Sequence, residues 1–92
     1  MISIERTSIF KKDYKRLKKK HYDMDKLKEV IVHLINEDTE FLRTKFQDHS
    51  LNGNWQGYRE LHVQNDWLLI YKIKKENLIL VLVRTGSHDK IL

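Results

Sequence analysis

The chain has 92 residues, 40% of them hydrophobic and 10% aromatic, which suits one small globular domain over residues 1–92. It has no cysteine, which excludes disulfides and thiolate metal sites, and no signal-peptide-like or membrane-spanning apolar run, so we expect a cytoplasmic protein without membrane contact. Eighteen Lys and Arg residues against thirteen Asp and Glu residues give a net charge of +5, which favours a polyanionic partner.

The first predicted elements are a short strand and a basic helix. Ile2 and Ile4 alternate with polar residues, and Thr7 or Ser8 can then cap a helix whose apolar positions have helical spacing. The basic charge is concentrated here, and this patch is either a solvated helix face or a nucleic-acid-binding surface, while an acidic partner protein could use it too. Its residues are Lys11, Lys12, Lys15, Arg16, Lys18, Lys19 and Lys20.

A second helix follows, and it should form a hairpin with the first. Asp23 is its predicted cap, and apolar residues recur every three or four positions from Met24 to Ile35. Periodicity fades over residues 36–50, which predicts a loop with apolar anchors and one helical turn. Gly53 and Gly57 then indicate a turn-rich loop leading into a sheet.

Three strands are predicted in the second half, over residues 58–63, 66–73 and 78–84. The short polar connections between them favour an antiparallel meander. Alternation places Leu61 and Val63 on one face of the first of these strands and His62 on the other. The predicted class is therefore α+β, with a two-helix hairpin packed on a small, mostly antiparallel sheet.

Four residues could perform acid–base chemistry: His49, His62, Asp66 and His88. Histidine suits proton transfer because its ordinary pKa lies near neutrality. RNA carries its own nucleophile, the 2′-hydroxyl, so a metal-free ribonuclease needs a proton acceptor, a proton donor and a cation beside the phosphate. If the strands pair as predicted, Asp66, His62 and His88 can approach one another, and His49 joins them if the glycine-rich loop folds back.

The predicted cations beside the phosphate are Arg59, Lys72 and Arg84. A zinc site is the competing interpretation, since three histidines and an aspartate are plausible ligands. Their spacing matches no short metal motif, however, so we predict no metal and no cofactor.

The chain resembles the YafQ branch of the RelE/ParE toxin superfamily in an ordered set of residues. That set is Asp48-His49, Leu51, Gly53, Trp55, Gly57-Tyr58-Arg59, His62, Asp66-Trp67, Leu69-Ile70-Tyr71-Lys72 and Arg84-Thr85-Gly86-Ser87-His88. The resemblance extends weakly through both helices. It implies a RelE-like fold.

The resemblance also implies an activity and partners. It implies an mRNA interferase that enters the ribosomal A site and cuts translated mRNA without metal. The implied partners are the ribosome and a cognate antitoxin, typically a ribbon-helix-helix protein. The toxin would associate with operator DNA only through this antitoxin.

Site roles follow from the same resemblance. It implies His88 as general acid, Asp66 or His49 as proton acceptor and His62 as a phosphate contact, with Trp67 as a supporting aromatic. Leu92 departs from close relatives, which carry a terminal Phe that contributes to activity, so a role for this tail is open.

Two other function classes are kept. A toxin that binds DNA gyrase, as in the ParE branch, uses the same fold without nucleolytic chemistry. A basic RNA-binding or ribosome-docking module would explain the lysine-rich helix but would leave His88 and Asp66 without a role.

Overall fold

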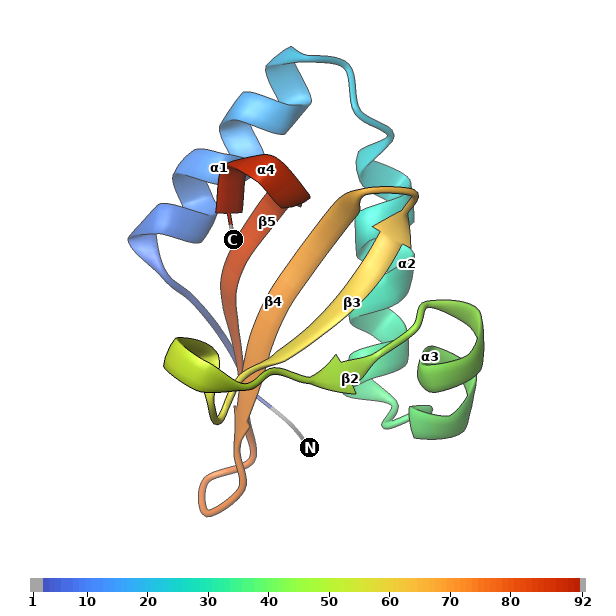
Figure 1. The fold of residues 1–92 in the computed structure, drawn as a ribbon, viewed down its shortest axis with the longest axis vertical. Helices are drawn as coiled ribbons and strands as arrows, with labels where there is room; N and C mark the ends of the chain where they lie inside the picture. Colours follow the sequence, from blue (N-terminus) through green and yellow to red (C-terminus); the bar gives the residue numbers. More distant parts are fainter. Residues whose placement is uncertain (1–2, 92) are drawn as a thin grey trace.

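The computed structural model describes residues 3–91 and has an α+β fold, which confirms the predicted class (Figure 1). In chain order the elements are β1 (Ser3–Arg6), α1 (Ser8–Lys19), α2 (Met24–Ile35), α3 (Thr39–Lys45), β2 (His49–Ser50), the 3-10 helix η1 (Gly53–Trp55), β3 (Arg59–Gln64), β4 (Trp67–Lys74), β5 (Ile79–Ser87) and α4 (His88–Ile91).

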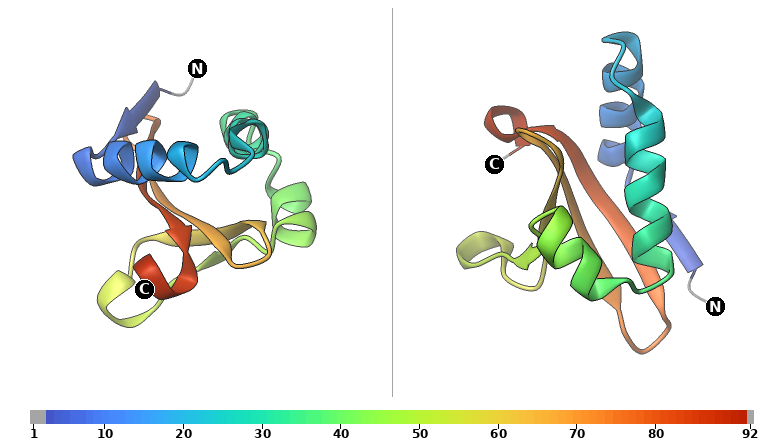
Figure 2. Two further views of the ribbon diagram at one scale, coloured as in Figure 1. Left: turned by 90° about the horizontal axis from the view of Figure 1, so that it is seen from above. Right: turned by 90° about the vertical axis from the view of Figure 1, so that its right-hand side faces the viewer.

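One five-stranded sheet with the order β1-β5-β4-β3-β2 organises the molecule. β1 runs parallel to β5, and the other neighbours are antiparallel, so the predicted meander of β3, β4 and β5 is present. α1 and α2 lie on one face of the sheet, and α4 and η1 lie on the other (Figure 2). We call these the helix face and the α4 face.

The starts of the two long helices are fixed by the predicted capping residues. The Thr7 hydroxyl accepts a hydrogen bond from Phe10 N at 3.0 Å and donates one to the Val83 carbonyl at 2.7 Å, which joins the start of α1 to β5. The Asp23 carboxylate accepts from Asp25 N at 3.2 Å at the start of α2. Within residues 3–91, no helix has the length and apolar character needed to cross a bilayer.

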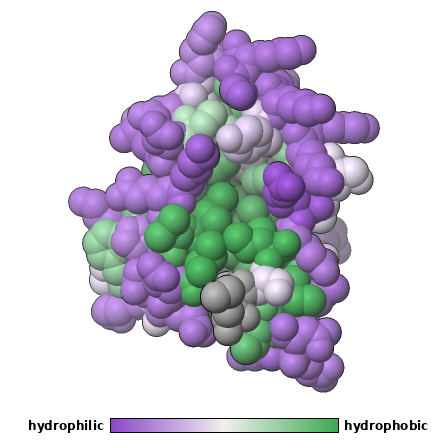
Figure 3. Space-filling view, turned by 180° about the vertical axis from the view of Figure 1, so that it is seen from behind, coloured by the Kyte–Doolittle hydropathy of each residue, from purple (hydrophilic) through white to green (hydrophobic). Residues whose placement is uncertain are grey.

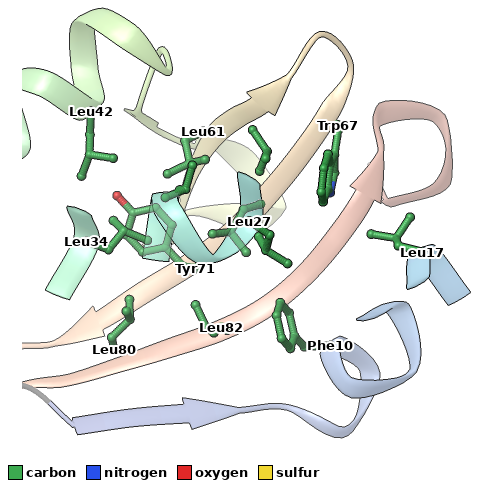
Figure 4. Packing of buried hydrophobic residues seen from close by; sticks show 13 residues of the cluster. Phe10, Leu17, Leu27, Leu34, Leu42, Leu61, Trp67, Tyr71, Leu80 and Leu82 are labelled. Carbon is green, nitrogen blue, oxygen red and sulfur yellow. The ribbon is translucent and has the colours of Figure 1, made fainter. Parts of the chain in front are cut away.

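Apolar side chains fill both faces of the central strands, because successive residues of a strand point to opposite sides. On the helix face, Leu69 and Tyr71 pack with the apolar stripes of α1 and α2 (Figure 4). On the α4 face, Leu68 and Ile70 pack with Ile91. Each fully buried Leu or Ile contributes about 1.5–3 kcal/mol to folding.

Residues 36–50 contain more structure than the sequence predicts. The seven-residue helix α3 exceeds the single turn expected, and the two-residue strand β2 then pairs with β3. Only Leu42 is buried among the residues of α3, so this helix has no repeating apolar pattern that the sequence could display.

Candidate active site

The pairing of β2 with β3 places two histidines around one carboxylate. His49 lies opposite Glu60 in the ladder, and His62, two residues further along β3, points to the same α4 face. Glu60 Oε1 is 3.5 Å from His49 Nε2 and 3.8 Å from His62 Nε2. The Glu60 side chain is only 7% exposed, and its Oε2 has no hydrogen-bond partner within residues 3–91. Both imidazoles therefore neighbour the same buried carboxylate oxygen.

Backbone carbonyls fix the orientation of both rings. The Gln47 carbonyl lies 2.7 Å from His49 Nδ1, and the Asn65 carbonyl lies 2.9 Å from His62 Nδ1. A carbonyl can only accept, so each Nδ1 carries the proton and each Nε2 is left to face Glu60. Gln47 and Asn65 both have positive φ, 57° and 50°, a conformation that non-glycine residues adopt rarely and often at functional sites.

Asp66 and His88 lie side by side, as the predicted strand pairing requires. The His88 backbone N–H donates to the Asp66 carbonyl at 3.0 Å, and Trp67 faces Ser87 across the β4–β5 ladder. Asp66 directly follows Asn65, whose carbonyl holds His62. The His88 imidazole is 61% exposed at the start of α4, so its position leaves the ring open to a ligand.

The structure thus forms two pairs of the predicted residues: His49 and His62 lie beside Glu60, and Asp66 and His88 are joined through their backbones at the β3–β4 turn. The glycine-containing loop after β2 folds back, so that β2 pairs with β3 and brings His49 to Glu60. Glu60 was not among the predicted site residues, although its alternation with His62 places both on one strand face. Among residues 3–91, no group of three or more His, Cys, Asp or Glu side chains is arranged to hold a metal ion.

A cavity of about 440 Å³ opens beside His62. Its wall carries two lysines, one from α2 and one from the end of α3, and amide side chains from the segments that hold the histidines. These residues are Lys26, Lys45, Gln47, Gln64 and Asn65, and Glu29 of α2 adds one carboxylate to the wall. Lys72 also lies on the α4 face, with its ammonium 5.0 Å from the centre of the Tyr58 ring. The surroundings of His62 are thus suited to a polar, anionic ligand.

Two of the predicted cations have partners inside the protein. Arg59 lies on the helix face, where its Nε donates to Asp48 at 3.3 Å and its Nη1 donates to Ser50 Oγ at 2.8 Å. Arg84 donates from Nε and Nη2 to the two oxygens of Asp13, at 3.2 and 3.1 Å. Both guanidinium groups are therefore engaged by carboxylates rather than directed at the histidines.

Trp67 is a core residue. Its ring is 3% exposed and packs edge-on against Tyr22, and its Nε1 donates to Thr85 Oγ1 at 2.9 Å. Trp67 therefore supports the start of β4, directly after Asp66, from inside the protein. Leu92 lies outside the described residues.

The basic patch lies on α1 and its C-cap residue Lys20, and Figure 2 shows α1 on the opposite side of the sheet from α4. Its six lysines are exposed, whereas Arg16 turns back to Asp13, with its Nη2 3.1 Å from Asp13 Oδ1. Asp13 was not predicted as a buried residue, yet it is 1% exposed.

A mostly antiparallel sheet with a helix pair on one face and a short terminal helix on the other defines the class of RelE-like bacterial toxins. A family model described as the bacterial toxin YafQ of type II toxin–antitoxin systems matches residues 2–92. The chain belongs to this YafQ family.

Individual relatives agree with this assignment. The mRNA interferase toxin YafQ of Escherichia coli K12 is 45% identical over 85 residues, which cover 92% of this chain and 89% of that protein. The crystal structure of YafQ from E. coli BL21(DE3) has a TM-score of 0.88 and 40% identity, covering 100% of this chain and 99% of that one. The toxin chain in the E. coli DinJ–YafQ complex has a TM-score of 0.87 and 39% identity, with the same coverage.

Proposed function

We propose that this protein is an mRNA interferase, an endoribonuclease that cuts translated mRNA in the ribosomal A site. The observation that carries the proposal is a pair of histidines, His49 and His62, beside the buried Glu60 carboxylate. A second pair, Asp66 and His88, is joined through its backbone at the β3–β4 turn, whose Asn65 carbonyl also holds His62. The E. coli relative, with 45% identity over most of the chain, is named for this activity.

The reaction needs two proton transfers. The 2′-oxygen attacks the adjacent phosphorus as its proton leaves, a bond from the 2′-oxygen to phosphorus forms, and the bond from phosphorus to the 5′-oxygen breaks as that oxygen gains a proton. The exposed His88 is assigned as the general acid, and Asp66 or His49 as the proton acceptor. Each positioned acid or base typically accelerates such a reaction by about 10²–10⁴-fold.

His62 and its cavity are assigned to the phosphate. With Nδ1 held by the Asn65 carbonyl, His62 has Nε2 available, and its imidazolium form would present Nε2–H to a phosphate oxygen as a charge-assisted donor. Lys26 and Lys45 line the adjoining cavity, so they are better placed than Arg59 or Arg84 to balance negative charge on the message. The chemistry so assigned uses protein side chains and the RNA alone, with no metal or cofactor.

A cognate antitoxin is part of the proposal, as is a cytoplasmic location where ribosomes are reached. The E. coli relative has been crystallised in a DinJ–YafQ toxin–antitoxin complex. The present chain shows apolar side chains gathered in the middle of its helix face, ringed by hydrophilic ones (Figure 3). Large exposed apolar residues include Ile9, Val32 and Ile73. Such a patch is typical of a protein interface, and a ribbon-helix-helix antitoxin would link the toxin to operator DNA.

Mapping mRNA 5′-ends after brief induction tests the proposed function. New ends are expected inside translated reading frames, because the ribosome presents the message to the toxin. A matched reporter whose start codon is mutated should keep its mRNA intact. Ends that persist on the untranslated reporter would remove the ribosome from the proposal, and intact mRNA together with inhibited supercoiling would favour a gyrase-binding toxin.

Neutralising part of the basic patch is expected to weaken ribosome association without unfolding the protein. The triple variant Lys12→Gln, Lys15→Gln, Lys19→Gln removes three exposed charges. If each contacts one phosphate, the slope of log affinity against log salt should become less steep by about 2–3. Binding to purified ribosomes at several salt concentrations measures this. Lys75→Gln, in the exposed β4–β5 turn, is the control, and an unchanged slope in the triple variant would leave the patch a solvated face.

A further inference from the structure

The residue directly before His49 is held inside the protein. Asp48 is 7% exposed, and its carboxylate accepts a hydrogen bond from the Tyr71 hydroxyl at 2.7 Å and another from Arg59 Nε at 3.3 Å. Its backbone N–H donates to the Leu42 carbonyl at 3.2 Å. Asp48 is therefore tied to α3, β3 and β4 at once. We call Asp48, Arg59 and Tyr71 the Asp48 anchor.

The anchor and His49 lie on opposite faces of the sheet. Arg59 faces Tyr71 in the β3–β4 ladder, and the Tyr71 hydroxyl points into the helix-face core near Leu34 and Leu42 (Figure 4). His49 faces Glu60 on the α4 face. Because side chains alternate along an extended segment, holding the carboxylate of residue 48 on one face sets the direction of residue 49 on the other.

The protonation states of Tyr71 and Arg59 allow both side chains to donate hydrogen bonds to the Asp48 carboxylate. Burial, followed by the hydrogen bond to Asp48, raises the pKa of Tyr71 well above its ordinary value, so the phenol stays a hydrogen-bond donor at every physiological pH. Burial alone would lower the pKa of Arg59, but interactions with Tyr71 and Asp48 outweigh it and the pKa is raised. The guanidinium charge is thereby committed to the anchor.

The strand that carries His49 is short, with only two residues, and a pair of that length contributes little stability by itself. Backbone hydrogen bonds hold the chain on either side of it, from His62 N–H to the Phe46 carbonyl at 2.8 Å and from Leu51 N–H to the Tyr58 carbonyl at 3.0 Å. The Asp48 carboxylate adds a side-chain attachment between these two points.

Gln47, which precedes Asp48, has a φ of 57°, and its carbonyl holds His49 Nδ1. A non-glycine residue keeps a left-handed backbone conformation only where the surrounding structure imposes it. For Gln47, the next residue, Asp48, supplies such a constraint, because its carboxylate is held by Tyr71 and Arg59.

We propose that Asp48, Arg59 and Tyr71 are positioning residues that hold the His49 imidazole in its reactive orientation. The inference rests on the proposed function, because orienting His49 matters for catalysis only if His49 takes part in mRNA cleavage. It assigns Arg59 to the far side of the sheet from the message and gives it no contact with the phosphate.

Asp48→Asn and Tyr71→Phe are the direct tests, since both change one functional group and keep nearly the same volume. Cleavage of one mRNA on programmed ribosomes should show kcat lowered by about 10–100-fold with KM within about twofold, as expected for a misplaced catalytic group. Long-range ¹⁵N NMR of His49 should show the Nδ1–H tautomer in the wild type and a tautomer mixture in both variants. On a His49→Ala background, Asp48→Asn should cause no further loss of kcat.

Two controls separate positioning from folding. Tyr14→Phe removes the hydroxyl of another half-buried tyrosine, on α1, and should leave kcat and the His49 signals unchanged. Thermal melts show whether each variant is folded, and if Asp48→Asn is not, Tyr71→Phe decides alone.

The outcomes distinguish the inference from the function on which it rests. Wild-type cleavage together with unchanged kcat and an unchanged His49 tautomer in a folded variant would overturn the inference. A wild type that does not cleave would overturn the proposed function instead, and the NMR comparison would then decide whether the anchor orients His49.

Discussion

Replacing His88 with alanine is expected to lower the rate of mRNA cleavage by about 10²–10⁴-fold, the usual contribution of one general acid. The His88 ring is 61% exposed, and its backbone, not its side chain, holds it to Asp66. Truncating an exposed side chain generally changes stability by less than about 0.5 kcal/mol. Single-turnover cleavage on programmed ribosomes, with a thermal melt of the same sample, measures both quantities.

His21 supplies the matched control. It is also exposed, it lies just after the C-cap of α1, and it has a φ of 64°, which asparagine tolerates. His21→Asn should therefore cleave at the wild-type rate. Full cleavage by a folded His88→Ala variant would remove His88 as the acid, and the proton donor would then have to be sought at His49 or His62.

The sheet and the two long helices could be predicted because their apolar residues repeat with a clear period. Thr7 and Asp23 signal helix starts through side chains that cap locally, within three residues. The alternation of Leu61 and Val63 with His62 likewise records which face of β3 is buried. Such signals are local, so one sequence suffices to find them.

Distant partners explain most of what the sequence did not predict. Asp13 stands among lysines and reads as a surface residue, yet its partner Arg84 is 71 positions away. Asp48 is likewise a buried carboxylate with a distant partner, since Tyr71 is 23 positions away. A buried carboxylate is recognisable only when the cation or hydroxyl that satisfies it is known, and this information is in the fold.

The candidate site was predictable to the extent that it follows strand pairing. The approach of Asp66 and His88 follows from the β4–β5 ladder, whose register places Trp67 opposite Ser87. Alternation along β3 also places Glu60 on the face of His62, but it does not reveal that the carboxylate is buried beside His49. The carbonyls of Gln47 and Asn65 have no signal in the sequence, because every residue has a backbone carbonyl. Candidate proton-transfer residues can thus be proposed from their side-chain chemistry, whereas the groups that orient them become visible only in the fold.

Replacing Asp13 with alanine is expected to lower the free energy of unfolding by about 2–4 kcal/mol. Asp13 accepts from Arg84 at two atoms and from the Thr85 backbone N–H at 3.2 Å, and Arg16 Nη2 is 3.1 Å away. Removal leaves the buried Thr85 N–H without an acceptor and two guanidinium groups without a counter-charge. Both arginines retain some contact with water, so the loss should fall below that of a fully buried ion pair.

For a domain of this size the loss of Asp13 corresponds to a melting temperature lower by roughly 10–30 °C. Asp13→Asn keeps an oxygen for the Thr85 N–H and should lie between the alanine variant and the wild type. Glu76→Ala, in the exposed β4–β5 turn, removes a carboxylate of the same charge and should melt within about 2–4 °C of the wild type, because surface substitutions cost at most about 0.5 kcal/mol. Equal melting temperatures for Asp13→Ala and Glu76→Ala would show that the Asp13 contacts contribute no net stability. In that case the β4–β5 ladder, the hydrogen bonds of the Thr85 hydroxyl and apolar packing would hold the end of β5, and with it His88, without a contribution from Asp13.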